Sequence, residues 1–244
     1  MAHRVLAVNT AAQAENKIHD DQVAAGYGFR GGLVPGVTVY GYMAEPLLTF
    51  APQWLEHGTM QLRLLEPFYD GDAVIVQTEP QEDGSIRITA EREDGKACAT
   101  GVAGFAPKGD PIPPLIPKSA MPELSERPVP SPETVVPGAL LGTIETTLTA
   151  NDPAALLQLS NDILARNFRL SPWIHIGSEI RNWAAARAGE QLSVRGRVQD
   201  RFDRKGHEFI VADVMIVGAD DRLIQTVRHT AIYRLRQPEA QAIP

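Results

Sequence analysis

The sequence predicts an α+β protein made of two similar halves, each with a long central helix wrapped by an antiparallel sheet. Three observations lead to this prediction. Prolines crowd one segment near the middle of the chain, a Trp-and-Gly pattern occurs once on each side of it, and a helical stretch precedes β-rich runs in both halves. At 244 residues, the chain is long enough for two domains of about 110 to 120 residues each.

The bulk composition is typical of a globular protein that stays inside the cell. Hydrophobic residues make up 43% of the chain and charged residues 22%, an ordinary balance that can build a sizeable core. With a formal net charge of −7 and no long basic run, nucleic acid is not an expected partner. Cys98 is the single cysteine and the chain starts without the apolar run of a signal peptide, so we expect a cytoplasmic protein. No stretch reaches the roughly 18 apolar residues of a spanning helix, so we expect no membrane association.

Residues 109–138 are expected to link the two halves. Prolines recur from Pro107 to Pro137, and proline removes a backbone donor and favours extended conformations. The segment is too long for a routine loop, so we expect it to run over the surface, partly ordered. The expected organisation is an N-terminal half at 1–108 that carries the candidate site, a structural C-terminal half at 139–237, and a tail at 238–244.

Each half is expected to contain one long helix. In the first half it covers residues 37–50, where apolar side chains keep helical spacing and thus predict burial on nearly all sides. Pro46 is expected to kink or end this helix, because it deletes one hydrogen bond of the helical ladder. In the second half, Asp152 followed by Pro153 is a typical helix start and opens a helix over residues 154–168.

The regions after the helices repeat one pattern and are rich in β-forming residues. Residues 54–64 align with residues 173–183, sharing a Trp, a Gly and a hydroxyl residue at identical offsets. Alternation and turn residues then predict strands over 73–78, 85–91 and 96–105 in the first half, and over 192–198, 208–217 and 223–235 in the second. We therefore expect a helix followed by a four-stranded meander, twice, with the two sheets able to join edge to edge and hide open strands.

One stretch of the first half resembles a known family. Asn16-Lys17-Ile18-His19-Asp20-Asp21, followed by a Gly-rich turn up to Gly36 at the helix start, is similar to the signature region of the MaoC-like, or (R)-specific enoyl-CoA hydratase, branch of the hot-dog fold. The segment 66–72, with its Pro and its Gly-Asp pair, resembles a strand turn of that family. The resemblance covers most of residues 1–106 and implies a double hot-dog fold.

The resemblance also implies a site. In such a site His19, Asn16 and Asp21 are the catalytic candidates, and the main-chain N–H of Gly36 holds the thioester oxygen at the positive end of the helix. Side chains of the apolar helix receive the acyl chain; the candidates are Val39, Tyr40 and Met43. No metal site is expected and no cofactor beyond CoA or an acyl carrier as part of the substrate.

Three positions depart from the family pattern. Ala14 stands where the hydratases carry the carboxylate that works with the histidine, Lys17 replaces the usual Pro, and Pro35 replaces the usual His. A methyl group cannot act as a general base, so hydration requires that Glu15, Asp20 or Asp21 substitutes. A purely structural interpretation remains open, in which Asn16, Asp20 and Asp21 cap and charge a short helix at residues 22–26.

Three functions therefore stay open. The first is a hydratase or dehydratase acting on an enoyl or 3-hydroxyacyl thioester, with His19 orienting water. The second is a thioesterase in which Glu45 or His19 helps water to attack the carbonyl, and the third is a non-catalytic acyl-thioester binder. Two fused halves already supply the dimer that single hot-dog proteins build, so a monomer and a homodimer are both open.

The second half also holds residues that a site could use. His175, Asn161 and Asp162 are such residues, but nothing around them matches the Asn-x-x-His spacing, so this half is interpreted as structural. The run Arg204-Lys205-Gly206-His207 is expected to be a solvated hairpin tip.

Overall fold

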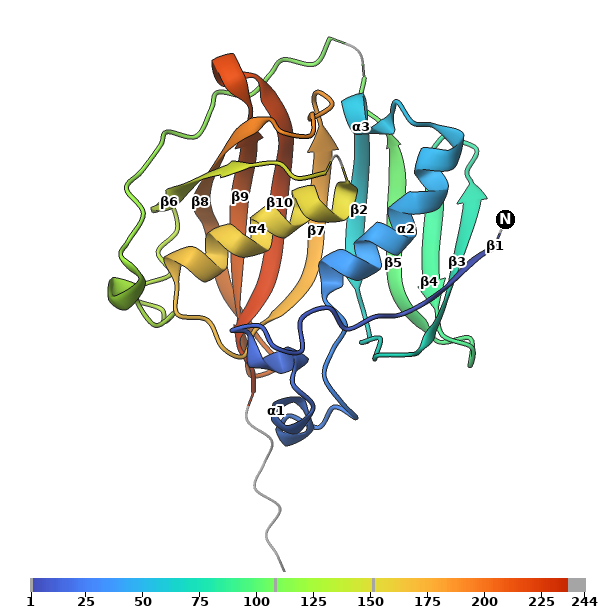
Figure 1. The fold of residues 1–244 in the computed structure, drawn as a ribbon, viewed down its shortest axis with the longest axis horizontal. Helices are drawn as coiled ribbons and strands as arrows, with labels where there is room; N and C mark the ends of the chain where they lie inside the picture. The colour runs from blue at the N-terminus through green and yellow to red at the C-terminus, as the bar shows by residue number, and fades with distance from the viewer. Residues whose placement is uncertain (1, 108, 151, 237–244) are drawn as a thin grey trace, which may run out of the picture.

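The strands of the protein form one antiparallel sheet. The structure is a computed structural model, and it describes residues 2–107, 109–150 and 152–236. The ten strands of this part lie in the order β1-β3-β4-β5-β2-β7-β10-β9-β8-β6 (Figure 1). Their bounds are β1 Ala2–Leu6, β2 Gly58–Leu64, β3 Ala73–Pro80, β4 Ile86–Glu91, β5 Ala97–Phe105, β6 Leu140–Thr147, β7 Ile174–Asn182, β8 Gln191–Arg204, β9 His207–Val217 and β10 Leu223–Arg234.

The two long helices, α2 and α4, lie side by side across one face of this sheet (Figure 1). Their bounds are α1 Asp21–Gly26, α2 Gly36–Phe50, α3 Trp54–His57 and α4 Pro153–Asn167, with 3₁₀ turns η1 Lys17–His19, η2 Leu124–Glu126 and η3 Ala219–Asp221. Helix α4 begins as expected, because the side chain of Asp152 accepts a hydrogen bond from the N–H of Ala154 at 3.0 Å. In α2, Pro46 does not end the helix, which continues to Phe50.

The two halves have the same topology. The first half orders its strands β1-β3-β4-β5-β2 around α2, and the second orders them β6-β8-β9-β10-β7 around α4. The repeated segments 54–64 and 173–183 accordingly lead into equivalent strands, β2 and β7. The α+β class and the paired sheets agree with the sequence-based expectation.

Two details differ from that expectation. Each half begins with a strand, β1 or β6, that the sequence did not predict. The strands after each long helix are also not one meander of four, because β2 pairs with β5 and β7 pairs with β10, leaving three-stranded meanders β3-β4-β5 and β8-β9-β10. Both β1 and β6 lie at the outer edges of the sheet, where half-exposed strands lack the apolar alternation that would reveal them.

The halves join along β2 and β7, which pair antiparallel in the middle of the sheet. Thr59 lies opposite Arg181, and Arg63 lies opposite Gly177. Gly177 permits this pairing, since a Cβ on it would lie 2.7 Å from the carbonyl oxygen of Leu62. The seam removes one open edge from each half and continues the hydrogen bonding across the molecule.

The proline-rich segment wraps around the C-terminal half (Figure 1). Asp110 forms an ion pair with Arg181 at 2.8 Å, and Ile116 packs into a cluster with Met215. Val135 is fully buried in the main core. The described part of the linker is therefore held by side-chain contacts along its length, while the expected tail at 238–244 lies outside the described residues.

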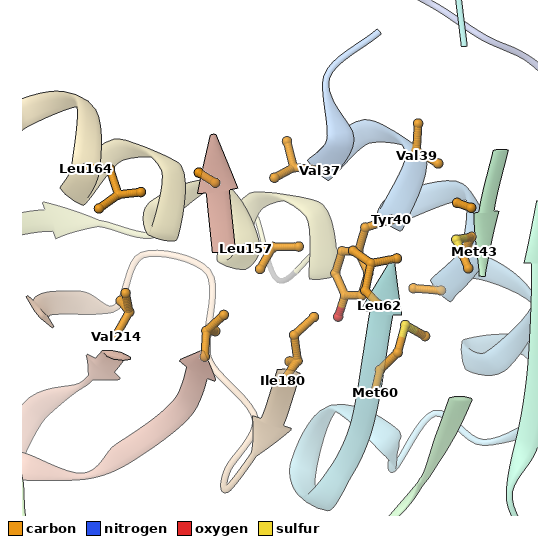
Figure 2. Close-up of a cluster of buried hydrophobic side chains, with 14 of the residues drawn as sticks. Val37, Val39, Tyr40, Met43, Met60, Leu62, Leu157, Leu164, Ile180 and Val214 are labelled. Atoms are coloured by element: carbon orange, nitrogen blue, oxygen red, sulfur yellow. The ribbon is translucent and has the colours of Figure 1, made fainter. Parts of the chain in front are cut away.

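The core lies between the long helices and the sheet. Tyr40 and Met43 extend from α2 towards the strand that carries Leu62 and Met60 (Figure 2), and all four side chains are buried. Leu157 and Leu164 of α4 enter the same continuous cluster. Among the described residues, no helix has both the length and the apolar character needed to cross a membrane.

Candidate functional site

The loop between β1 and α2 is held in place by the acidic residues beside His19. Asp20 caps α1, accepting hydrogen bonds from the N–H groups of Gln22 and Val23, both at 3.0 Å. Asp21 accepts a hydrogen bond from the N–H of Gly32 at 2.7 Å and does not line either of the two cavities described below. Gly32 must be a glycine here, since a Cβ would lie 2.1 Å from the carbonyl oxygen of His19. The structure thus gives Asp20 the capping role and places Asp21, a catalytic candidate, in a bracing position.

His19 is held in one tautomer. Its Nδ1 lies 2.6 Å from the carbonyl oxygen of Leu33, which can only accept, so Nδ1 carries the proton and Nε2 carries a lone pair. Burial lowers the pKa of His19 below its ordinary value of 6.5, although the hydrogen bond to Leu33 acts in the opposite direction. The side chain is therefore a neutral imidazole at pH 7, with a basic nitrogen available.

Asn16 ties this loop to the other half of the chain. Its Oδ1 accepts a hydrogen bond from the N–H of Trp173 at 3.1 Å, and its Nδ2 donates to the carbonyl oxygen of the same residue at 3.0 Å. The same Nδ2 lies 3.4 Å from Nε2 of His19. Asn16 thus fixes the position of β7 relative to the imidazole of His19.

Helix α2 presents free N–H groups at its start. Pro35 precedes it and offers no side-chain cap, and the carbonyl oxygen of Pro35 accepts from the N–H groups of Thr38 and Val39. Within the part of the chain that the structure describes, no acceptor is found for the N–H of Gly36. A free N–H at the positive end of a helix favours negative charge on a ligand.

Asn16, His19 and Gly36 line one cavity of about 240 Å³, which we call the apolar cavity. Most of its remaining wall is hydrophobic, with Leu33, Val39, Leu64, Phe68, Trp173 and Ile232 among its residues. A second cavity of about 700 Å³, which we call the interhelical cavity, is lined by Ala14 and Val37 on one side and by Ala154 and Asp162 of α4 on the other. Both cavities share Asn16, His19, Pro35, Asn161 and Trp173, so His19 lies where they meet.

The substrate-binding candidates on α2 separate into two groups. Gly36 and Val39 line the apolar cavity, but Tyr40 and Met43 do not. Both of these side chains are 0% exposed and lie in the core on the sheet side of the helix (Figure 2). The helical period explains the difference, because neighbouring positions of a helix point in directions about 100° apart.

Of two other carboxylates considered from the sequence, Glu15 borders the interhelical cavity and Glu45 lines neither cavity. Glu15 pairs with Arg127 of the linker at 2.8 Å and is exposed. Glu45 is 60% exposed and lies 3.2 Å from His3 at the surface of α2. Neither position suits a base that must act on a buried thioester.

Comparison with solved structures shows what this architecture is similar to. A protein from Alicyclobacillus acidocaldarius described as having a hot-dog fold matches with a TM-score of 0.58 at 12% identity, over 96% of this chain and 92% of that one. A MaoC domain protein from Chloroflexus aurantiacus, described as a dehydratase, matches with a TM-score of 0.55 at 9% identity, over 96% and 95% of the two chains. An acyl-CoA thioesterase II from Mycobacterium marinum matches with a TM-score of 0.53 at 17% identity, over 85% and 93%. The chain has the double hot-dog fold. Neither a protein-family model nor a curated protein sequence matches it.

In this double hot-dog, the C-terminal half contributes directly to the cavities. Asp162 of α4 accepts a hydrogen bond from Nε2 of Gln158 at 2.7 Å, and Nδ2 of Asn161 lies 3.4 Å from Oε1 of the same Gln158. Burial raises the pKa of Asp162, while Gln158 and Arg166 act in the opposite direction. Asp162 is therefore a carboxyl group, lining the same cavity as His19, that holds a proton more readily than an ordinary aspartate.

From the sequence, the second half was interpreted as structural, although Asn161, Asp162 and His175 were named as residues that a site could use. Asn161 and Asp162 lie in a helix that also carries Gln158, Ser160 and Arg166, so no local pattern marked them as lining a cavity. His175 follows Trp173 in the repeated segment, and its buried ring also lines the apolar cavity. His207, expected at a solvated hairpin tip, lies on the wall of this cavity as well.

Proposed function

We propose that the double hot-dog protein is a hydratase or dehydratase of acyl thioesters, with His19 as the base. One observation carries the proposal: the lone pair of His19 Nε2 and the unpaired N–H of Gly36 belong to the wall of a single apolar cavity. A base close to a donor for a carbonyl oxygen is the arrangement that addition to an enoyl thioester requires. The apolar wall suits an acyl chain.

The proposed hydration uses both groups. The N–H of Gly36 donates to the thioester oxygen, and Nε2 of His19 removes a proton from water. The water oxygen bonds to C3 of the enoyl group, the C2=C3 electron pair moves towards C2, and the negative charge collects on the oxygen held by Gly36. A proton then adds to C2 and completes the product. Dehydration follows the same steps in reverse.

Asp162 is proposed to take the place of the carboxylate that is missing at Ala14. Both residues line the interhelical cavity, which meets the apolar cavity at His19 and Asn161. The acidic candidates close to His19 in the sequence already have other partners, since Asp20 caps α1, Asp21 binds Gly32 and Glu15 pairs with Arg127. With its raised pKa, Asp162 is suited to give a proton to C2 and to take it back.

Thioester hydrolysis is the second candidate function. It is favoured by the likeness in fold to an acyl-CoA thioesterase, and it would use the same base and the same donor, with water attacking the carbonyl carbon. Glu45 has no part in this version, because it faces solvent and lies beside His3.

The test is an assay with a panel of enoyl-, 3-hydroxyacyl- and saturated acyl-CoA esters, in which enoyl absorbance and free thiol are followed together. Loss of enoyl absorbance without thiol release is the expected result. Release of thiol would replace the proposal with hydrolysis, and binding without either change would make the protein an acyl-thioester binder.

A matched pair of variants ties the activity to the cavity. His19→Asn is expected to remove it, whereas His57→Asn, at a histidine that lines neither cavity, is expected to leave it unchanged. Equal activity in the two variants would contradict the role of His19.

A further inference from the structure

Three buried polar side chains form a hydrogen-bonded chain below the start of α2. Ser178 Oγ lies 2.9 Å from Nε2 of His175 and 3.0 Å from Nδ1 of His229. The two imidazole rings stack with their centroids 4.2 Å apart. Ser178 on β7 lies directly opposite His229 on β10, so the pairing of the strands builds the contact. All three side chains are buried, in a position where polar groups are costly unless they have partners.

The two ends of this chain differ in what lies beside them. Within the described residues, Nδ1 of His175 and Nε2 of His229 have no hydrogen-bond partner. His175 belongs to the wall of the apolar cavity, and its Nδ1 lies 2.8 Å from the point where a Cβ on Gly36 would be. His229 lines neither cavity. Of the two rings, only that of His175 therefore borders a cavity that a bound molecule can occupy.

The position of the protons follows from this difference. Burial lowers the pKa of His175 to about 4, although a hydrogen bond with the backbone of Gly177 acts in the opposite direction. Burial and the neighbouring His175 lower the pKa of His229 well below 6.5, so both rings are neutral at pH 7. The serine hydroxyl must then donate to one ring and accept from the other, which leaves one N–H and one lone pair at the two ends. An N–H without an acceptor is the rarer of the two in proteins. The N–H therefore belongs at His175 Nδ1, where a ligand oxygen can accept it, and the lone pair belongs at His229 Nε2.

We propose that His175 Nδ1–H is a second hydrogen-bond donor for the carbonyl oxygen of an acyl thioester, beside the N–H of Gly36. Ser178 and His229 act as positioning residues that hold His175 in the donor tautomer. The inference rests on the proposed function, because it assumes that the cavity receives a thioester. Two donors in a site without water stabilise the charge that collects on that oxygen during addition, elimination or hydrolysis. The two halves of the chain supply one donor each.

The tautomer can be measured without any substrate. Nitrogen NMR separates protonated from unprotonated imidazole nitrogens, and the chain has only six histidines to assign. We expect both His175 and His229 to be protonated at Nδ1. In this pattern the N–H of His175 is free to donate at the cavity end of the hydrogen-bonded series. In Ser178→Ala, which loses the linking hydroxyl, the ring of His175 is expected to populate both tautomers. A wild-type His175 protonated at Nε2 would overturn the proposal.

The donor role is measured on a bound thioester. A dienoyl-CoA absorbs at longer wavelength when its carbonyl is polarised, so the shift on binding reports the strength of the donors. We expect His175→Phe to reduce the shift and to lower kcat by about 100-fold with KM little changed. Ser178→Ala keeps the ring of His175 and changes the side-chain volume little, so we expect smaller losses of the absorbance shift and of kcat. This variant also tests the proposal if His175→Phe fails to fold. His57→Phe is the control and should match the wild type.

The possible failures are distinguishable. A wild-type protein that converts thioesters while His175→Phe keeps the full shift and the full kcat would overturn this inference and leave the proposed function intact. A wild-type protein that neither binds nor converts any thioester would overturn the proposed function and this inference with it.

Discussion

The proposed chemistry of His19 depends on which of its two ring nitrogens carries the proton. The Nδ1–H group of His19 donates a hydrogen bond to the carbonyl oxygen of Leu33, so Nε2 is the nitrogen that can act as a base. The same histidine lies where the two cavities meet, next to the amide of Asn16. A single hydrogen bond to the backbone thus determines both the orientation of the ring and its chemical role.

Replacing His19 by Asn is expected to lower turnover by about 100-fold or more. The amide nitrogen of Asn can keep the bond to Leu33 while the nitrogen at the Nε2 position is lost, so the melting temperature should change little. Steady-state kinetics and a thermal melt check the two expectations. A variant that loses stability and keeps its activity would assign His19 a structural role.

The acid limb of the pH profile provides a second test of His19. Because burial lowers its pKa below 6.5, the ring stays neutral, and active as a base, to a more acidic pH than a free histidine would. The acid limb of the kcat/KM profile is therefore expected to have its midpoint below pH 6.5. A midpoint above 6.5 would contradict this assignment of the base.

Gly36→Val is expected to abolish activity. A Cβ at this position would lie 2.3 Å from Leu64 and 2.8 Å from the ring of His175, so valine would displace the wall of the cavity at the proposed carbonyl site. Gly26→Ala is the matched control, because nothing lies within 4 Å of its added Cβ. Gly32→Ala is unsuitable, since it would strike the backbone of His19. Activity in Gly36→Val equal to that of the control would rule out a carbonyl site at the start of α2.

At this scale the sequence named candidate residues whose roles stay predictions. Asn16, His19 and Gly36 were named together because they match a family motif within one stretch of the sequence, and the structure places all three on the wall of one cavity. Tyr40 and Met43 were misplaced because an apolar helix buried on most sides does not reveal which face borders a cavity. Asn161 and His175 reach the same cavity through contacts between the halves, and such contacts leave no pattern in a single sequence.

Among the elements, the two long helices differ in what they bring to the cavities. Helix α2 offers the N–H groups of its first turn, and α4 offers polar side chains from its middle. Both helices were predicted to within a residue or two at each end, because their apolar period and the Asp152 cap are local features. The edge strands β1 and β6 were not predicted, since they are held by their neighbours β3 and β8 rather than by an apolar pattern of their own.

Asp162→Asn tests whether α4 takes part in catalysis. The amide oxygen can still accept the hydrogen bond from Gln158, so the helix should keep its structure, while the group loses the ability to transfer a proton. We expect a fall in kcat of about 100-fold, the scale of a general acid–base group. Asp203→Asn, at an exposed carboxylate of β8, is the control. Unchanged kcat in Asp162→Asn would return α4 to a purely structural role.

For the molecule as a whole, the buried histidine pair makes folding sensitive to acid. The pKa of His175 is lowered to about 4 in the folded state, against 6.5 in an unfolded chain, so the unfolded chain binds this proton more readily. The contribution of His175 to the free energy of unfolding is therefore fully present above pH 6.5 and is lost as the pH drops from 6.5 towards 4. The shift corresponds to about 3 kcal/mol for His175, and His229 acts in the same direction.

Urea denaturation at a series of pH values measures this loss. In the double variant His175→Phe, His229→Phe, the unfolding free energy is expected to depend less on pH between pH 6.5 and pH 4. Carboxylates titrate in both proteins, so their contribution cancels in the difference between the variant and the wild type. His57→Asn should keep the full dependence. Identical curves for the wild type and the double variant would contradict the role of the pair.

Because the two halves join along β2 and β7, a ligand that binds between them stabilises the folded protein. Asn16 and His19 come from one half and Asn161 and Trp173 from the other, so an occupant of the cavities touches both sides at once. Such a ligand binds only the assembled molecule, and at a hundred times its Kd it adds about 2.7 kcal/mol to the free energy of unfolding. A screen for thioesters that raise the melting temperature can therefore rank acyl chains and carriers by affinity before the reaction itself is known.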